Sequence, residues 1–197
     1  MSADPPLVLI VEDEPDLAEL YATWLRDDYR VRVAYGGREA LEALDEEVAV
    51  VLLDRRMPDL SGDEVLDGVR ERTTGCRVAM VTAVEPDFDI IGMGFDDYLV
   101  KPVSKDALRE TVSNLLLRNT YDEGVQELFS LASKKALLES EKSPAALETN
   151  SEYAELDARL QELRDSLDET LAELSKQEDL SVLYRNIGAN SSPSDDE

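Results

Sequence analysis

Four polar residues each stand directly after a short apolar run and could together handle a phosphoryl group: Asp13 (with Glu12 before it), Asp54, Thr82 and Lys101. Clustered carboxylates repel one another, so they either bind a hard cation or become protonated. Mg²⁺ is the cation that best fits such a cluster, because it binds a few carboxylates and keeps waters and phosphate oxygens in its coordination shell. A carboxylate can also act as a covalent nucleophile, while an ammonium and a hydroxyl group stabilise phosphoryl oxygens. These residue types indicate phosphoryl transfer to Asp54.

Each of these residues also has a simpler structural interpretation. Glu12 and Asp13 could be ordinary charges at a helix N-terminus, where the helix dipole favours them. Thr82 alone could cap a turn, and Lys101 alone could be a solvated strand end. Asp54 is harder to explain in this way, because an isolated carboxylate is costly beside a fully apolar strand.

The apolar runs alternate with amphipathic stretches, which predicts strands alternating with helices. The expected strands are Leu7–Val11, Arg30–Ala34, Val48–Leu53, Arg77–Val81 and Asp97–Val100. The expected helices begin at Pro15, after the Gly36-Gly37 turn (reaching Leu44), around Val65, at Pro86–Gly92 (short) and after Ser104. This alternation favours an α/β, flavodoxin-like (βα)5 fold with a parallel five-stranded sheet covered on both faces. Its functional crevice lies at the carboxyl ends of the strands, where the four polar residues fall.

At this point the sequence resembles the receiver domains of two-component response regulators, over about residues 5–118. The resemblance rests on four runs in order: Val11-Glu12-Asp13-Glu14-Pro15, Leu52 to Gly62 around Asp54, Thr82-Ala83, and Asp96-Asp97-Tyr98-Leu99-Val100-Lys101-Pro102. The family implies that a sensor histidine kinase phosphorylates Asp54. It also implies that Lys101 contacts the phosphoryl group and that the Lys101–Pro102 bond is cis.

The resemblance further implies a magnesium site and a conformational switch. Mg²⁺ is expected on Asp13, Asp54 and the backbone carbonyl of Arg56, with Glu12 reaching it through water. Thr82 is expected to move toward the phosphoryl group and Tyr98 to rotate inward behind it, a two-state change driven by a local charge. Arg55 and Arg56 depart from the commonest family pattern, and we expect these cations to alter hydrolysis of the acyl phosphate.

The sequence changes character after residue 118. A helix is expected over Tyr121–Leu138, an interruption at Ser143-Pro144, a connector over Ala145–Ser151 and then a second helix. An a/d heptad stripe follows, formed by Tyr153, Leu156, Leu160, Leu163, Leu167, Thr170 and Leu174. This helical hairpin or coiled coil is similar to the HalX domain that follows receivers in haloarchaeal regulators. It is either a dimerisation or partner-docking module or a hairpin packed against its own receiver. We therefore expect a receiver at 5–118, a HalX-like domain at 119–187 and a disordered tail at 188–197.

Composition narrows the remaining choices. The formal net charge is −25, with 45 acidic and 20 basic residues, which is typical of a halophile. Such charge opposes direct nucleic-acid binding, which needs Lys and Arg clusters. The chain has no His and a single cysteine, Cys76, which excludes a His-ligated metal and an intrachain disulfide. We expect no leader peptide and no membrane span, and thus a cytoplasmic protein.

The sequence as a whole predicts a phosphoaccepting regulator whose only chemistry is its own phosphorylation and slow dephosphorylation at Asp54. Its helical domain is expected to act through protein contacts, by homodimerisation or on a downstream protein. The alternatives are a DNA-binding transcriptional regulator and a pseudo-receiver scaffold that is never phosphorylated. A phosphoaspartate hydrolase is disfavoured, because Arg56 stands where such enzymes carry a second Asp.

Overall fold

The computed structural model describes residues 4–72, 75–86 and 88–188, with backbone only for Asp89 and residues 177–188. It divides into two compact units that meet within one helix, after Asn119. The sequence places the domain boundary one residue earlier, after residue 118. The tail predicted at 188–197 lies outside the described residues apart from Gly188, the last residue of a helix.

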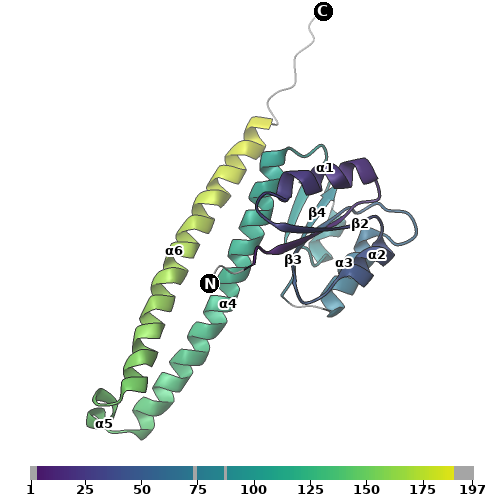
Figure 1. Cartoon of the computed structure of the whole chain (residues 1–197). Coiled ribbons are helices and arrows are strands. Elements are labelled where there is room, and N and C mark those ends of the chain that lie inside the picture. Colours follow the sequence, from purple (N-terminus) through teal and green to yellow (C-terminus); the bar gives the residue numbers. More distant parts are fainter. Residues whose placement is uncertain (1–3, 73–74, 87, 189–197) are drawn as a thin grey trace, which may run out of the picture. The chain divides into compact units, whose positions relative to one another are not determined.

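The first unit is built on a parallel sheet of five strands in the order β2-β1-β3-β4-β5 (Figure 1). The strands are β1 (Leu7–Val11), β2 (Arg30–Ala34), β3 (Val48–Leu53), β4 (Arg77–Thr82) and β5 (Asp97–Val100). Four of them match the predicted bounds. β4 runs one residue further than expected, so that Thr82 ends the strand instead of following it.

Helices follow the strands in turn. They are α1 (Pro15–Leu25), α2 (Gly37–Ala43), α3 (Gly62–Arg72), the 3-10 helix η1 (Phe88–Gly92) and α4 (Lys105–Glu141). Two expectations were wrong in detail. Leu44 has extended backbone angles and lies outside α2, and the segment predicted as a short helix from Pro86 forms only a 3-10 turn.

Side chains of alternate strand residues fill two cores, one on each face of the sheet. Val8, Ile10 and Leu52 pack with α1 and the start of α4, whereas Leu9 and Leu53 pack with α2 and α3. Both faces are covered, and β1 and β3 are apolar throughout, as expected for the inner strands of a parallel sheet. The predicted fold of this unit is confirmed, and its polar crevice can lie only at a strand end.

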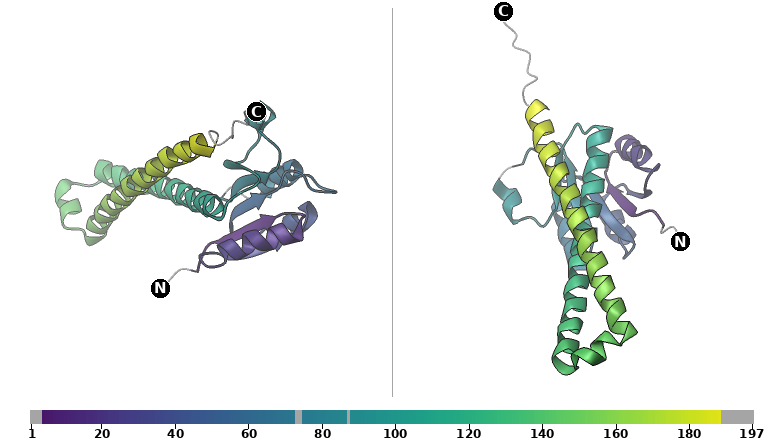
Figure 2. Two further views of the ribbon diagram at one scale, coloured as in Figure 1. Left: turned by 90° about the horizontal axis from the view of Figure 1, so that it is seen from above. Right: turned by 90° about the vertical axis from the view of Figure 1, so that its left-hand side faces the viewer.

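The second unit contains an antiparallel helical hairpin. Its first arm is the part of α4 after Asn119, its second is α6 (Ser151–Gly188), and the short helix α5 (Pro144–Glu148) lies in the predicted connector (Figure 2). Cross-arm pairs run in opposite directions along the two helices: Glu127 with Arg159, Lys135 with Asp157, and Glu139 with Tyr153. The predicted pattern of two helices with an interruption is therefore confirmed.

The heptad stripe of α6 is the face buried in this unit. Leu160, Leu163, Leu167 and Leu174 are buried, and Leu167 and Leu163 lie over Gly124 of α4. The stripe thus packs within its own chain, at least in part. Among the described residues no helix is long and apolar enough to cross a membrane.

Candidate phosphoacceptor site

Backbone hydrogen bonds that extend the sheet ladder fix the positions of the site residues. The N–H of Asp54 donates to the Val11 carbonyl (2.9 Å), and the N–H of Lys101 donates to the Thr82 carbonyl (2.8 Å). Glu12 likewise donates its N–H to Ala34 at 3.1 Å. The residues after β1, β3 and β5 are therefore held by neighbouring strands, and their side chains converge at one end of the sheet.

Lys101 lies at the centre of this cluster. Its Nζ donates to Asp54 Oδ2 at 2.6 Å and to Glu12 Oε2 at 2.7 Å. Both carboxylates are buried, with Glu12 2% and Asp54 7% exposed. Because unpaired buried charges are costly, the ammonium of Lys101 offsets part of the cost of burying the two carboxylates.

The electrostatics of the cluster reflect this shared charge. Burial raises the pKa of Glu12 above its ordinary value, although the hydrogen bond and the charge of Lys101 oppose that change. Burial alone would lower the pKa of the Lys101 ammonium. The hydrogen bonds and charges of Asp54 and Glu12 outweigh it, so that the pKa of Lys101 is raised. Lys101 is therefore a fixed positive charge beside Asp54 at neutral pH.

Three carboxylates meet in a way that suits a cation. Oxygen atoms of Glu12, Asp13 and Asp54 lie within 4.8 Å of one another. An all-oxygen cluster of this kind fits Mg²⁺, which takes a few carboxylates and completes its shell with water. The structure thus brings together the four carboxylate and ammonium residues that the sequence singled out.

The loop after Asp54 is held by its own backbone and by Gly62. The N–H of Arg56 donates to Asp54 Oδ1 at 3.1 Å, and the N–H of Gly62 donates to the Arg55 carbonyl at 2.9 Å. A Cβ at Gly62 would lie 2.2 Å from the Asp54 carbonyl oxygen, so only glycine fits there. Asp59, at φ 68°, turns the loop in the left-handed region that Asp tolerates.

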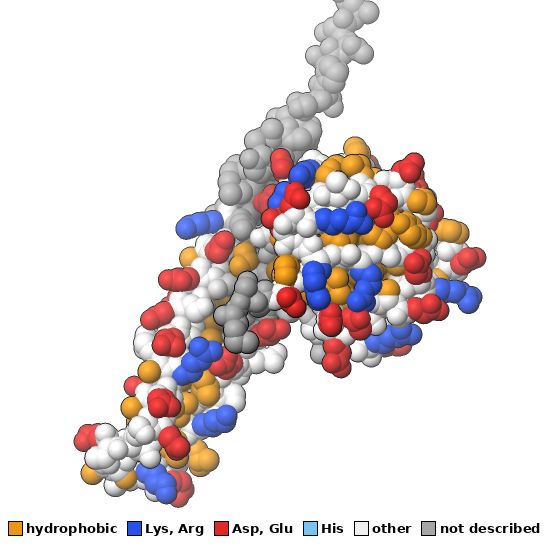
Figure 3. All heavy atoms as spheres, in the orientation of Figure 1, with side chains coloured by type: hydrophobic (Ala, Val, Ile, Leu, Met, Phe, Trp, Pro, Cys, Tyr) orange, Lys and Arg blue, Asp and Glu red, His pale blue; other side chains and the backbone are white. Residues whose placement is uncertain are grey.

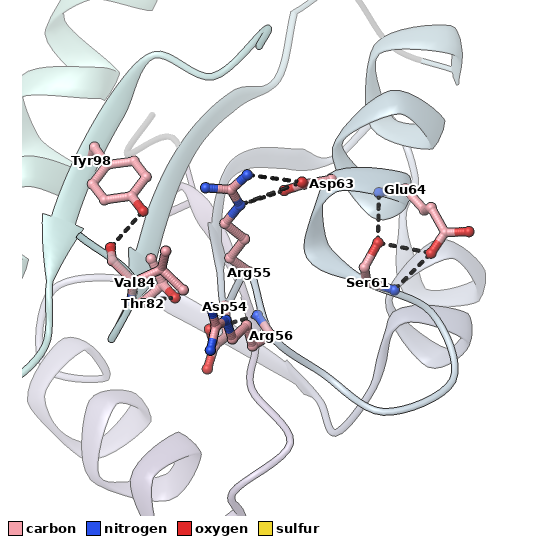
Figure 4. A network of polar contacts seen from close by, with 9 residues as sticks. All are labelled: Asp54, Arg55, Arg56, Ser61, Asp63, Glu64, Thr82, Val84 and Tyr98. Atoms are coloured by element: carbon pink, nitrogen blue, oxygen red, sulfur yellow. Dashed lines mark hydrogen bonds and ion pairs between the residues drawn. The ribbon is translucent and has the colours of Figure 1, made fainter. Parts of the chain in front are cut away.

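The two arginines after Asp54 have different surroundings. Figure 4 shows Arg55 extending to Asp63 of α3, whose Oδ1 accepts from its Nε at 3.0 Å. Arg56 is exposed. From the sequence we expected both cations to act beside Asp54, but the charge of Arg55 is balanced by Asp63. No local sequence pattern could have predicted the Arg55–Asp63 ion pair, because Asp63 lies in the next helix.

Thr82 and Tyr98 are joined through Val84 (Figure 4). Thr82 is fully buried, and its Oγ1 accepts a hydrogen bond from the Val84 N–H at 3.3 Å. The Tyr98 hydroxyl donates to the Val84 carbonyl at 2.7 Å, and its ring packs against Phe95 with 5.4 Å between centroids. The sequence marked Thr82 and Tyr98 but missed Val84, because backbone groups leave no residue signature. The Lys101–Pro102 bond is cis, as expected.

Comparison with known proteins shows which family the chain belongs to. Residues 8–113 match the response regulator receiver domain, and residues 117–184 match the HalX domain. The chain is a two-component response regulator. A candidate transcriptional regulator of Haloferax volcanii is 50% identical over 159 residues, which is 80% of this response regulator and 27% of that protein. The regulatory protein LuxO of Vibrio cholerae is 33% identical over 112 residues, which is 54% of this chain and 25% of LuxO.

Solved receiver domains share the fold of the first unit. The signal receiver domain of a candidate LuxO repressor from Vibrio parahaemolyticus is 30% identical, with a TM-score of 0.56, covering 62% of this response regulator and 98% of that chain. TrrA of Thermotoga maritima is 32% identical, with a TM-score of 0.50. The match covers 56% of this response regulator and 98% of the TrrA chain. This response regulator spans only about a quarter of the length of the Haloferax and LuxO proteins. These relatives are regulators. The Haloferax protein comes from a haloarchaeon, which agrees with the resemblance to haloarchaeal regulators.

Proposed function

We propose that Asp54 accepts a phosphoryl group from a sensor histidine kinase and that the C-terminal helices pass the signal on by protein contacts. The observation that carries this proposal is the Asp54 carboxylate itself. It is buried, with Lys101 on one oxygen and the Arg56 N–H on the other, beside two further carboxylates. Such a carboxylate is pre-oriented, and its surroundings can accept added negative charge.

Mg²⁺ is the cofactor that this site would hold. Asp13 and Asp54 would bind it directly, Glu12 through water, and the Arg56 carbonyl would complete the protein ligands. When bound, the cation would neutralise charge on the phosphoryl oxygens. The similar receiver TrrA was solved in complex with Mg²⁺-BeF, which supports this assignment.

The transfer itself needs little from the protein beyond position and charge. An Asp54 oxygen forms a bond to phosphorus while the bond from phosphorus to the kinase imidazole nitrogen breaks, and the electron pair of that bond stays on the nitrogen. Lys101 already touches Asp54, so it can move its hydrogen bond to a phosphoryl oxygen while it keeps its contact with Glu12. Water later cleaves the acyl phosphate, which is the only other chemistry we assign.

The signal would leave the site through Thr82 and Tyr98. A phosphoryl oxygen on Asp54 offers the Thr82 hydroxyl a new acceptor, and any movement of Thr82 acts on Val84, to which Tyr98 is bonded. The 3-10 helix η1 begins four residues after Val84. The side chains of Phe88 and Ile91 in it are 86% and 80% exposed. A partner protein can bind these apolar side chains, and their position would change when Thr82 and Tyr98 move.

The receiver boundaries at 5–118 and the HalX-like domain at 119–187 belong to this proposal, as does homodimerisation through the helices.

The second candidate function is that of a transcriptional regulator that binds DNA, favoured by the Haloferax relative, which is a candidate transcriptional regulator. A net charge of −25 weighs against direct contact with DNA. A salt-dependent shift of promoter DNA by the pure protein would support the second candidate. We propose a cytoplasmic location, because histidine kinases draw on cytoplasmic ATP.

The test is incubation of the full chain with Mg²⁺ and acetyl phosphate at high salt, followed by intact-mass measurement. We expect a gain of one phosphoryl group that Asp54→Asn abolishes. Asp59→Asn is the matched control, because it removes a carboxylate from the same loop and Asn tolerates the left-handed backbone. A variant Asp54→Asn that still gains the group would place the acceptor elsewhere. If a cognate kinase also fails to label the wild type, the protein is a scaffold.

A further inference from the structure

One face of α4 in the second unit is free of charged residues over four turns. Its members are all exposed: Gln126, Phe129, Ser130, Ser133, Ala136, Leu137 and Ser140. At about 100° per residue these positions fall on one side of the helix. We call this set the neutral face. It lies opposite the side of α4 that packs on α6, where Gly124 meets Leu167.

The neutral face stands out against the rest of the unit. The outward side of α6 bears exposed acidic residues: Glu155, Glu162, Asp165, Glu169 and Glu173. Red acidic side chains are likewise scattered over the visible surface of both units in Figure 3. One-third of all residues in this chain are charged, so a helix face without any charge is a departure that packing inside the hairpin does not explain.

The chemistry of the neutral face is that of a protein contact. Phe129 is 70% and Leu137 64% exposed, which leaves large apolar groups in water. Two hydroxyl groups of this face are turned toward the helix backbone: Ser133 Oγ donates to the Phe129 carbonyl and Ser140 Oγ to the Leu137 carbonyl, both at 2.8 Å. Small residues at Ser130, Ser133 and Ala136 would let another helix approach closely.

The order of residues on this face is symmetric about Ser133. Phe129 and Leu137 lie four residues to either side of it, Ser130 and Ala136 three, and Gln126 and Ser140 seven. We propose that a second copy of this chain docks here, with the two α4 helices antiparallel and a two-fold axis through Ser133. Each Phe129 then covers the partner's Leu137, the small residues face one another, and Gln126 meets the partner's Ser140. A two-fold contact requires this self-complementarity.

Charge favours a second copy over a charged partner. Two chains of −25 repel each other, and a face without charged residues adds little to that repulsion. The contact is about 22 Å long at 1.5 Å per residue, too short for an obligate interface. It should strengthen in concentrated salt, which screens the flanking charges and favours apolar burial. It rests on the homodimerisation named in the proposed function and gives that contact a surface, but it needs no phosphoryl group, so phosphorylation of Asp54 and docking at the neutral face can fail separately.

Cysteine cross-linking in the full chain tests the contact without a phosphodonor. Ser133→Cys should form a covalent dimer in about 2 M KCl, several-fold faster than the control Glu169→Cys on the outward face of α6. The native Cys76 is buried, and burial raises the pKa of its thiol to about 12, so it should not compete. Equal rates for the two variants would overturn the proposal and leave the face to a different partner.

The register has its own test. Gln126→Cys should not cross-link to itself but should cross-link to Ser140→Cys in a mixture of the two proteins. Self-linking of Gln126→Cys would show a parallel pair and contradict the two-fold axis through Ser133. Phe129→Lys and Leu137→Glu should each reduce dimer formation, and the double variant should restore it, because each Lys then faces a Glu of the partner. Failure of that rescue would also count against the proposed pairing.

Discussion

At the residue scale the site depends on where single side chains and backbone groups meet. The sequence could predict that Asp13, Asp54 and Lys101 lie close together, because each follows an apolar strand and parallel strands end at one edge. It could not predict that Lys101 bridges Asp54 and Glu12 at 2.6 and 2.7 Å, since such distances depend on tertiary packing. The Arg55–Asp63 pair and the Val84 link were invisible for the same reason.

Gly62→Ala tests how closely the Asp54 loop is packed. The added Cβ would lie 2.2 Å from the Asp54 carbonyl oxygen and 2.7 Å from the Arg55 Cα, both backbone atoms that cannot simply turn away. We expect a loss of about 2 kcal/mol or more in the free energy of unfolding and slower phosphorylation. Gly75→Ala is the control, because a Cβ there meets nothing within 4 Å. Equal stabilities in urea unfolding would contradict the tight fit.

Arg56→Ala tests whether an exposed cation tunes the acyl phosphate. We expect its lifetime to change by several-fold at low salt and by less in concentrated KCl, because exposed charges are screened. Arg56→Lys should keep most of the wild-type rate. The measurement is loss of phosphoryl mass with time after the donor is removed. A lifetime that Arg56→Ala leaves unaltered at low salt would remove any role for this side chain.

At the element scale a charged network joins β4 and α3 to Asp96, the residue before β5. Asp96 accepts from Arg70 at 2.6 Å, from Arg77 at 2.8 Å and from the Val78 N–H at 2.8 Å. The sequence marked Asp96 only as part of a family run. It could not show the network, because the partners are 18 to 26 residues away. Strand positions, by contrast, were readable from local apolar runs.

Asp96→Asn should destabilise the receiver by about 2–3 kcal/mol at neutral pH, because it removes the carboxylate charge that Arg70 and Arg77 share. Burial acts to raise the pKa of Asp96, but the Val78 N–H and the two arginines hold it below its ordinary value. An acid with a lowered pKa stabilises the fold above its unfolded pKa, about 3.9, and loses that effect as the pH falls through the folded pKa. The difference from wild type in urea unfolding should therefore shrink below about pH 4. A constant difference would contradict the ionised network.

The heptad stripe of α6 should hold the two arms of the hairpin together. Leu160 is 2% exposed, so Leu160→Ala should cost the hairpin about 2–4 kcal/mol. Leu171→Ala is the control, because Leu171 is 47% exposed. Hydrogen exchange should quicken in residues 120–141 and 151–176 and stay unchanged in the strands of the first unit. Unchanged protection of the helices would mean that the stripe is buried elsewhere. The heptads predicted which side is buried, but not that α4 covers it.

At the scale of the whole molecule, charge dominates. The excess of acid is shared by both units, and no local feature of the fold demands it. Its physical effect is self-repulsion, which salt relieves. The composition alone was enough to predict a halophilic protein, and the Haloferax relative agrees with it. The partners of the chain, by contrast, are not encoded in composition.

We expect the melting temperature to rise by roughly 10 °C or more between about 0.1 M and 2 M KCl, because the Debye length falls from about 10 Å to below 3 Å. Sucrose at equal osmolality should give a smaller increase, since it leaves charge repulsion intact. Circular dichroism during heating measures both. A melting temperature that is independent of KCl would show that the charge does not limit stability.

Borohydride trapping identifies the residue that carries the phosphoryl group. Borohydride reduces an aspartyl phosphate to homoserine, which peptide mass spectrometry locates to a single residue. After treatment with Mg²⁺ and acetyl phosphate at high salt, we predict homoserine at Asp54 and at no other aspartate. Homoserine at Asp13, Asp59 or Asp63 instead of Asp54 would contradict the account.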